Sequence, residues 1–98
     1  MTTVQIVYWR DIPAQVKARS GRVRAGKPLA NRFQEAIDAA AMRAGLSQSD
    51  AYLAEWRTAD ALERDGDPAS IVDAVVAELE SAYSPERLQA LVAQGGRA

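Results

Sequence analysis

Cysteine and histidine are both absent from this 98-residue sequence. Without cysteine the chain has no disulfides and no thiolate metal sites, and nothing in it indicates an oxidising compartment. Without histidine it lacks the commonest general base of enzymes. The remaining side chains form no recognisable catalytic constellation. We therefore expect no enzymatic activity, no cofactor and no metal.

Aromatic residues supply only 6% of the chain, and much of the apolar remainder is alanine. The few large side chains must therefore form most of the core. The segment MTTVQIVYWRD lacks the charged lead and long apolar run of a signal peptide, and no apolar stretch is long enough to span a bilayer. We expect a cytoplasmic protein without membrane contact. Its length suits one domain, residues 1–94, followed by a frayed tail at 95–98.

Charge is divided unequally along the chain. Residues 1–34 contain seven basic side chains and one acidic side chain, whereas residues 35–98 contain five basic and twelve acidic ones. The net charge of −1 therefore hides a dipolar chain. The basic side chains of the first segment are Arg10, Lys17, Arg19, Arg22, Arg24, Lys27 and Arg32.

Two strands are predicted at the amino-terminal end. Residues 2–9 (TTVQIVYW) are rich in β-branched and aromatic side chains and are apolar at both alternating positions, which predicts an interior strand. Pro13 then interrupts the run, because proline cannot donate to a ladder. Residues 14–20 (AQVKARS) alternate again, which predicts a half-buried strand with Lys17 and Arg19 on its outer face.

The Ser-Gly pair at residues 20–21 suits a tight turn into RVRAGK. Such a hairpin would place Arg19 beside Arg22 and Lys17 beside Arg24. Like charges that lie directly opposite one another are destabilising. The segment is therefore either a loose loop or a hairpin in which an anion relieves the repulsion.

The first helix is predicted to begin near Asn31. This residue suits the capping position, with Gln34 three residues on. Phe33 and Ile37 belong to an apolar stripe at helical spacing, and Gly45 follows as the expected terminator.

Two further helices are predicted from the Asp-Pro pair at residues 67–68 and the Ser-Pro pair at 84–85, both typical of helix starts. The segment before them is ambiguous. Residues 52–57 (YLAEWR) alternate as a strand does, whereas Ser47 and Asp50 have the spacing of a capping box that would start a short helix. We expect a strand here.

This order of elements predicts a two-layer α+β domain. Its antiparallel sheet would have three or four strands, with two main helices on one face and a short C-terminal helix. The Trp-Arg pairs at residues 9–10 and 56–57 are consistent with strands that lie near one another. Their simplest interpretation is an aromatic core with arginine lying over the rings.

Three stretches of the chain, VQIVYWRDIPAQV, RFQEAIDAAAMRAG and DAYLAEWR, resemble a small bacterial family labelled "virulence factor". Its members share a Tyr-Trp-Arg-Asp-Ile-Pro start, a helix containing Ala-Met-Arg and a later Trp-Arg. The resemblance extends from Val4 to about Leu91. It carries over no functional residue. It implies an accessory subunit associated with corrinoid-dependent and folyl one-carbon methyl-transfer components.

The basic side chains allow three interpretations. They could solvate a sheet face or pair with the acidic helices of the same chain. They could bind an acidic protein partner, with Lys17 and Arg19 beside an exposed Trp9 or Trp56 supplying the mixture of basic and aromatic residues that interfaces favour. They could instead follow a nucleic-acid backbone, although the acidic half of the chain would repel it.

We favour the second interpretation, a non-enzymatic interaction module that acts as an accessory or adaptor subunit and binds an acidic protein partner. Nucleic-acid binding through the same residues is the alternative. The candidate partner-binding residues are Arg10, Lys17, Arg19, Arg22, Arg24, Lys27, Arg32, Trp9, Trp56 and Arg57.

Overall fold

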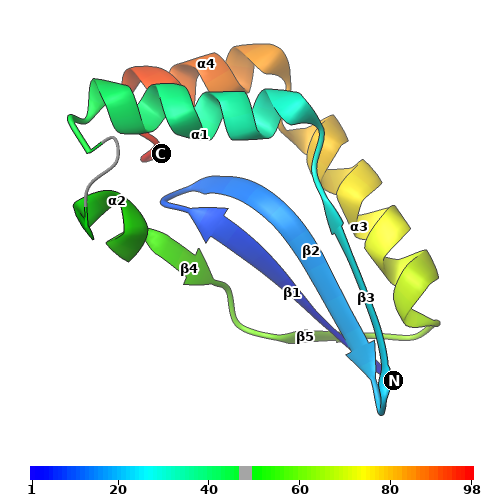
Figure 1. Ribbon diagram of the computed structural model, residues 1–98. Coiled ribbons are helices and arrows are strands. Elements are labelled where there is room, and N and C mark those ends of the chain that lie inside the picture. The colour runs from blue at the N-terminus through cyan, green and yellow to red at the C-terminus, as the bar shows by residue number, and fades with distance from the viewer. Residues whose placement is uncertain (47–49) are drawn as a thin grey trace.

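The computed structural model describes residues 1–46 and 50–98 (Figure 1). The predicted two-layer α+β architecture with an antiparallel sheet is confirmed, and the chain forms no helix in its described part that is long and apolar enough to cross a membrane. In chain order the elements are β1 (Thr2–Trp9), β2 (Ile12–Ser20), β3 (Val23–Pro28), α1 (Asn31–Arg43), α2 (Asp50–Ala54), β4 (Trp56–Thr58), β5 (Leu62–Arg64), α3 (Pro68–Ala82) and α4 (Pro85–Ala93).

Strand β1 lies in the interior of the sheet, as predicted. It pairs with β2 on one side, and β2 pairs with β3, all antiparallel. The other side of β1 is shared by two short strands, because β5 pairs with residues 2–4 and β4 pairs with residues 7–9. The sheet therefore has five strands rather than three or four.

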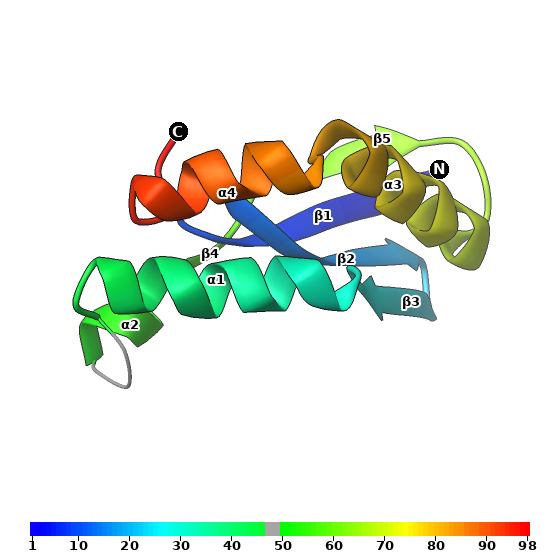
Figure 2. The same ribbon diagram turned by 90° about the horizontal axis from the view of Figure 1, so that it is seen from above.

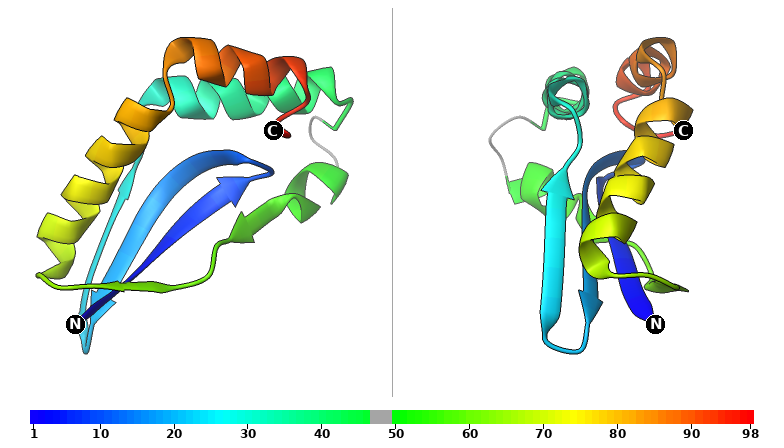
Figure 3. Two further views of the ribbon diagram at one scale, coloured as in Figure 1. Left: turned by 180° about the vertical axis from the view of Figure 1, so that it is seen from behind. Right: turned by 90° about the vertical axis from the view of Figure 1, so that its right-hand side faces the viewer.

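One face of the sheet is packed against α3. Val4 lies opposite Ala18 and Ile6 opposite Val16, and of these four side chains only Ile6 is more than marginally exposed. Helix α3, yellow in Figure 3, contacts β1, β2 and β3. The residues between these positions alternate to the opposite face, as the period of two requires. The half-buried character predicted for β2 is therefore confirmed.

Helices α1 and α4 lie side by side above the sheet (Figure 2). The predicted stripe of α1 is confirmed at Phe33 and Ile37, which are 1% and 0% exposed. The ring of Phe33 meets Tyr83, at the end of α3, edge to face with 6.1 Å between the ring centroids. This contact joins α1 to the layer formed by α3 and α4.

Helices α3 and α4 begin as predicted. The Asp67 carboxylate accepts a hydrogen bond from the Ser70 N–H at 3.0 Å, and Pro68 follows in the first turn. The Ser84 hydroxyl accepts one from the Arg87 N–H at 3.1 Å. Each side chain satisfies a donor that the first helical turn leaves free.

The start of α1 differs from the prediction. Asn31 does not cap the helix, because it is already the first helical residue, and the capping position is Ala30. The Ala30 N–H donates to the Glu80 carboxylate of α3 at 2.8 Å, so a distant acid performs the function expected of a local side chain. The end of α1 is as predicted: Gly45 has a φ of 73°, and the Leu46 N–H donates to the Ala41 carbonyl at 2.8 Å.

The segment predicted as a strand over 52–57 is wrong in its first half. Residues 50–54 form α2, and the strand β4 begins only at Trp56. The Tyr52 ring lies 5.6 Å from that of Trp9 and 6.2 Å from that of Trp56. Tyr52, Trp56 and Trp9 thus form one aromatic cluster. Ser47, half of the capping box considered for this segment, lies outside the described residues.

Strands β2 and β3 form a tight hairpin, so the loose-loop alternative is wrong. The turn consists of residues 21–22, and the glycine that begins it has a φ of 59°, as a type II′ turn requires. The predicted register of the hairpin is wrong, because the turn was expected at residues 20–21 and lies one residue later. Arg19 faces Arg24, and Lys17 faces Gly26. Two like charges do lie opposite one another, although the partners differ from those predicted.

Residues 95–98, the tail predicted to fray, make contacts with the end of the sheet in the structure. The Asp11 N–H donates to the Gly96 carbonyl at 2.8 Å, and Gly96 is buried. A Cβ at Gly96 would lie 2.8 Å from the Trp9 ring, and its φ of 92° also favours glycine. The tail is therefore packed against the end of the sheet.

We expect Phe33→Ala and Ile37→Ala each to lower the free energy of unfolding by about 2–5 kcal/mol, because both leave a cavity in the core. Urea denaturation measures the effect, and Gln34→Ala, on the exposed face of the same helix, is the control. Losses below about 0.5 kcal/mol for both core variants would contradict the packing described for α1.

Candidate functional site

The sheet face turned away from α3 contains a hollow of about 550 Å³. Its polar lining comes from three adjacent strands, and the alternation of β1 and β2 directs it away from the core. All the residues that line the hollow belong to β1, β2 and β3. The polar side chains that line it are Thr3, Gln5, Gln15, Lys17, Arg19 and Arg24, with Lys27 at its border.

Three cations of this face, Lys17, Arg19 and Arg24, are close together; we call them the basic sheet face. All three are exposed. Arg19 and Arg24 are direct partners across β2 and β3, and Lys17 is two residues from Arg19 on the same side. Gly26, opposite Lys17, contributes no side chain, which leaves the hollow open there.

No carboxylate in the described part of the chain forms an ion pair with Lys17, Arg19 or Arg24. Glu63 of β5 is aligned with Thr3, which is in turn aligned with Arg19, and it is an acid in the same row. It too makes no ion pair within residues 1–46 and 50–98. The mutual repulsion of these cations is therefore not offset by a direct contact inside the molecule.

Four other predicted cations are engaged by their own chain. Arg10 pairs with Glu55 at 3.1 Å, and Lys27 pairs with Asp73 at 3.5 Å. Arg57 pairs with Asp11 at 3.4 Å, and Arg32 donates to the Glu80 carbonyl at 2.7 Å. These contacts fix secondary structure elements to one another.

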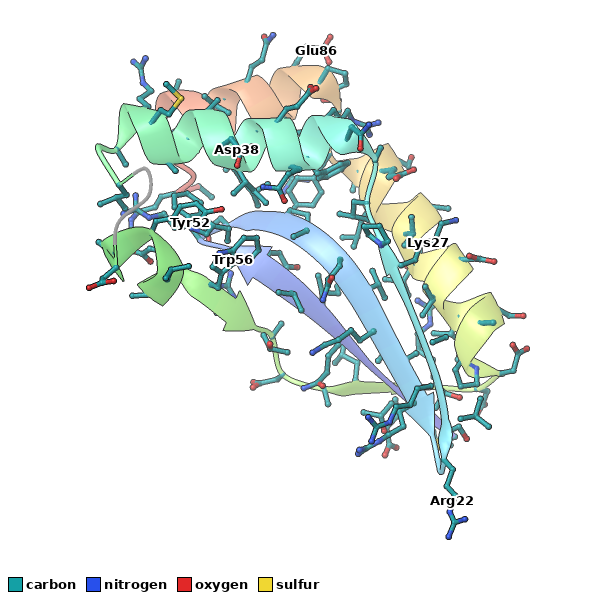
Figure 4. The ribbon with its side chains drawn as sticks, viewed as in Figure 1. Arg22, Lys27, Asp38, Tyr52, Trp56 and Glu86 are labelled. Carbon is teal, nitrogen blue, oxygen red and sulfur yellow. The ribbon has the colours of Figure 1, made fainter. Side chains whose placement is uncertain are left out.

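Arg22 occupies the turn between β2 and β3 and points away from the body of the molecule (Figure 4). It forms no ion pair within the described residues. It extends the positive charge of the basic sheet face beyond the sheet. Lys27, in contrast, lies beside α3 in the same view, in keeping with its contact to Asp73.

Neither tryptophan lies on the basic sheet face. Trp9 is 0% exposed, and its indole N–H donates to the Tyr52 carbonyl at 2.9 Å. Trp56 is partly buried and packs edge to face against Tyr52 (Figure 4). The predicted combination of Lys17 and Arg19 with an exposed Trp9 or Trp56 is therefore wrong, because the Trp9 ring belongs to the core and Trp56 packs against it.

The polar neighbours Thr3, Gln5 and Gln15 were not among the predicted site residues. They share the face of Lys17 by register, since Gln5 lies opposite Lys17 and Thr3 opposite Arg19. The period-two alternation of side chains along both strands predicts that these residues share one face of the sheet. Along residues 1–46 and 50–98 no group of three or more acidic, histidine or cysteine side chains is placed to hold a metal ion.

Fold and site together define a small two-layer α+β domain that presents one open, basic sheet face. The chain belongs to the virulence factor family, whose model matches residues 7–92. This confirms the resemblance found in the sequence. Comparisons with curated proteins and with solved structures gave no match.

We expect Arg24→Gln to leave the free energy of unfolding unchanged or to raise it by up to about 1 kcal/mol at low salt, because it removes one of two opposed like charges. The gain should shrink as added salt screens the pair. Chemical denaturation at two ionic strengths measures both effects.

Arg10→Gln is the comparison variant, because the Arg10 side chain is only 12% exposed and donates to both Glu55 and Gly95. It should cost about 1–3 kcal/mol. A loss of that size for Arg24→Gln would show that its own chain holds Arg24, against the description above.

Proposed function

We propose that this chain is a non-catalytic binding module, an accessory subunit that binds an acidic, extended segment of a protein partner on its basic sheet face. One observation carries the proposal: Lys17, Arg19 and Arg24 are exposed side by side without an ion pair in the described chain, whereas four of the other predicted cations are engaged by their own chain. A carboxylate placed between Arg19 and Arg24 would replace their repulsion with two attractions.

The chemistry of the face favours carboxylates. Arginine presents a planar fork that donates hydrogen bonds to both oxygens of a carboxylate, and Lys17 adds a mobile point charge. The flanking Gln5 and Gln15 supply amide donors and acceptors. Because the face is exposed, its charges would act chiefly through steering and specificity, and binding should weaken with salt.

The edge of the sheet favours an extended partner. Strand β3 pairs with β2 alone, so its outer edge is free in the described sheet. A partner strand laid along this edge would form main-chain hydrogen bonds, as in strand-addition complexes. Alternate acidic side chains of that strand would then face Arg24 and, beyond it, Arg19.

Nucleic acid is less well supported by the same surface. Single-stranded nucleic acids are held largely by stacking of bases on aromatic rings. The lining of the hollow includes no aromatic residue, and Trp9 is buried. The acidic remainder of the chain would also repel a polyanion more strongly than a short acidic segment.

The family resemblance adds a pathway to the proposal. It points to a partner among corrinoid-dependent or folyl one-carbon methyl-transfer components. In that role this chain would position another subunit and would not itself carry the methyl group.

The test uses a fluorescently labelled oligoglutamate peptide as the probe. We expect saturable binding at low salt that weakens as salt rises. The variant Lys17→Gln/Arg19→Gln/Arg24→Gln should lower the affinity about tenfold or more, since three exposed charge contacts of up to about 1 kcal/mol each are lost. Fluorescence anisotropy measures the binding.

The matched control is Arg43→Gln/Arg64→Gln/Arg97→Gln, which removes the same charge from positions outside the face. Equal loss of affinity in both triple variants would reduce the effect to net charge and overturn the proposal. Tighter binding of a single-stranded oligonucleotide than of the peptide, lost in the first variant alone, would favour the alternative function. Thermal melting of all three proteins verifies that they are folded.

A further inference from the structure

A second hollow, of about 490 Å³, lies away from the basic sheet face, where β1 and β4 approach the end of α3 and the start of α4. Figure 3 shows these elements from behind in its left view. Two tyrosines and two arginines line the hollow, together with one acid. They are Tyr8, Tyr83, Arg57, Arg87 and Asp11.

Each arginine lies over one of the tyrosine rings. The Arg57 guanidinium carbon is 4.5 Å from the centroid of the Tyr8 ring, and that of Arg87 is 4.0 Å from the Tyr83 ring. Such stacking fixes the planes of both guanidinium groups while leaving their edges free to donate. The hollow therefore contains two oriented cations.

The two arginines differ in whether an acid of the same chain pairs with them. Arg57 pairs with Asp11 at 3.4 Å, and the other Asp11 oxygen accepts from the Ala98 N–H at 2.7 Å. Within the described residues the Arg87 guanidinium donates only to the Ala82 carbonyl, at 3.0 Å, and forms no ion pair. One positive charge is thus left uncompensated at the α4 side of the hollow.

The Tyr8 hydroxyl is a donor in this surrounding. Burial raises the pKa of Tyr8, and the neighbouring Tyr83 raises this pKa further, which keeps the phenol protonated at neutral pH. Neither tyrosine hydroxyl has a hydrogen-bond partner in the part of the chain that the structure describes. Both hydroxyls remain available to a ligand.

An apolar groove of about 330 Å³ continues from this hollow, and Tyr8 and Ala59 line both. Its walls are the aliphatic side chains of β1 and α3. Its far part is charged but neutralised, because Arg64 of β5 and Glu78 of α3 form a bidentate pair at 3.0 and 3.3 Å. The aliphatic residues of β1 and α3 are Val4, Ile6, Val75, Leu79 and Ala82, and Ala59 and Leu62 also line the groove.

We infer that the hollow and its groove form a binding site for a small amphipathic carboxylate. The carboxylate would accept hydrogen bonds from Arg87, from Arg57 and from the Tyr8 hydroxyl, and the hydrocarbon chain would lie in the groove between β1 and α3. The orientation follows from charge: Arg64 is already neutralised by Glu78, and Asp60 also lines the groove, so an anion fits only at the Arg87 end. Apolar walls with a few convergent polar groups are typical of small-molecule sites.

The test measures binding of octanoate, with acetate and octanol as probes that carry only the carboxylate or only the chain. Isothermal titration calorimetry of the wild-type chain should show octanoate binding at least about tenfold tighter than either. Arg87→Gln should weaken octanoate binding about tenfold or more, since charged hydrogen bonds are lost. Tyr8→Phe, which retains the ring, should weaken it about fivefold.

Arg43→Gln is the matched control, because Arg43 also donates to a single backbone carbonyl, that of Ala93 at 3.0 Å, and lines neither hollow nor groove. It should bind octanoate as the wild type does. Absence of octanoate binding to the wild type, or equal affinity in Arg87→Gln and Arg43→Gln, overturns the inference. Amide shifts in nuclear magnetic resonance spectra should report octanoate at Tyr8 and Val75; shifts confined to the basic sheet face also overturn it. Circular dichroism verifies the fold of each variant.

Discussion

The burial of Trp9 is the interaction on which one whole end of the molecule depends. Its ring is 0% exposed, its indole N–H is bound by Tyr52, and Gly96 approaches it so closely that no side chain fits there. Trp9 also faces Trp56 across β1 and β4. Segments from the start, middle and end of the chain therefore meet at a single side chain.

The Trp9 cluster also accounts for contacts that Arg10 and Arg57 make within the chain. Arg10 lies over the Trp9 ring at 5.2 Å and pairs with Glu55, next to Trp56. Arg57 donates to the Arg10 carbonyl at 2.9 Å. Each Trp-Arg pair thus ties one strand to the other side of the cluster, and both arginines make contacts within the fold. Lys17, Arg19 and Arg24, which form no ion pair within the described residues, lie toward the other end of β2, near the β2–β3 turn.

The separation of held and free charge follows from the geometry of the sheet. Alternation along β2 sends Val16 and Ala18 toward α3 and sends Lys17 and Arg19 to the open face. The same rule in β3 places Lys27 on the α3 side, where Asp73 is within reach. Neighbouring basic residues in the sequence therefore have different environments, and only a subset is available to a partner.

Local patterns were sufficient for much of this fold. Period-two alternation identified β1 and β2, and the capping residues Asp67 and Ser84 marked the starts of α3 and α4, because these signals act within a few residues. The β2–β3 turn and the segment that forms α2 were predicted wrongly from local signals, whereas two other features depend on distant partners. The Ala30 N–H is satisfied by Glu80 of α3, and the tail is held by Asp11 and by the Trp9 ring, contacts that no local window contains.

The candidate site was predictable to a similar degree. Lys17, Arg19 and Arg24 were identified from charge, but charge alone could not separate them from Arg10, Arg32 and Arg57. That separation depends on register and on which acid the fold brings near. The pocket around Arg87 and Tyr83 was not predicted, although Arg57 was among the candidate residues, since its members come from β1, β4 and the α3–α4 junction and share no motif. Only the packing of the two layers brings them together.

The central claim is that the two sides of one sheet have separate uses, with unpaired cations on the open side reserved for an acidic partner. It is tested most directly by following the backbone amides in ¹⁵N-edited nuclear magnetic resonance spectra while an oligoglutamate peptide is added. The account predicts shifts at residues 15–19 and 23–27, with those of the outer strand β3 largest, and none at Tyr8, Arg57 or Arg87. Shifts spread evenly over exposed basic residues, or concentrated at Arg57 and Arg87, would contradict it.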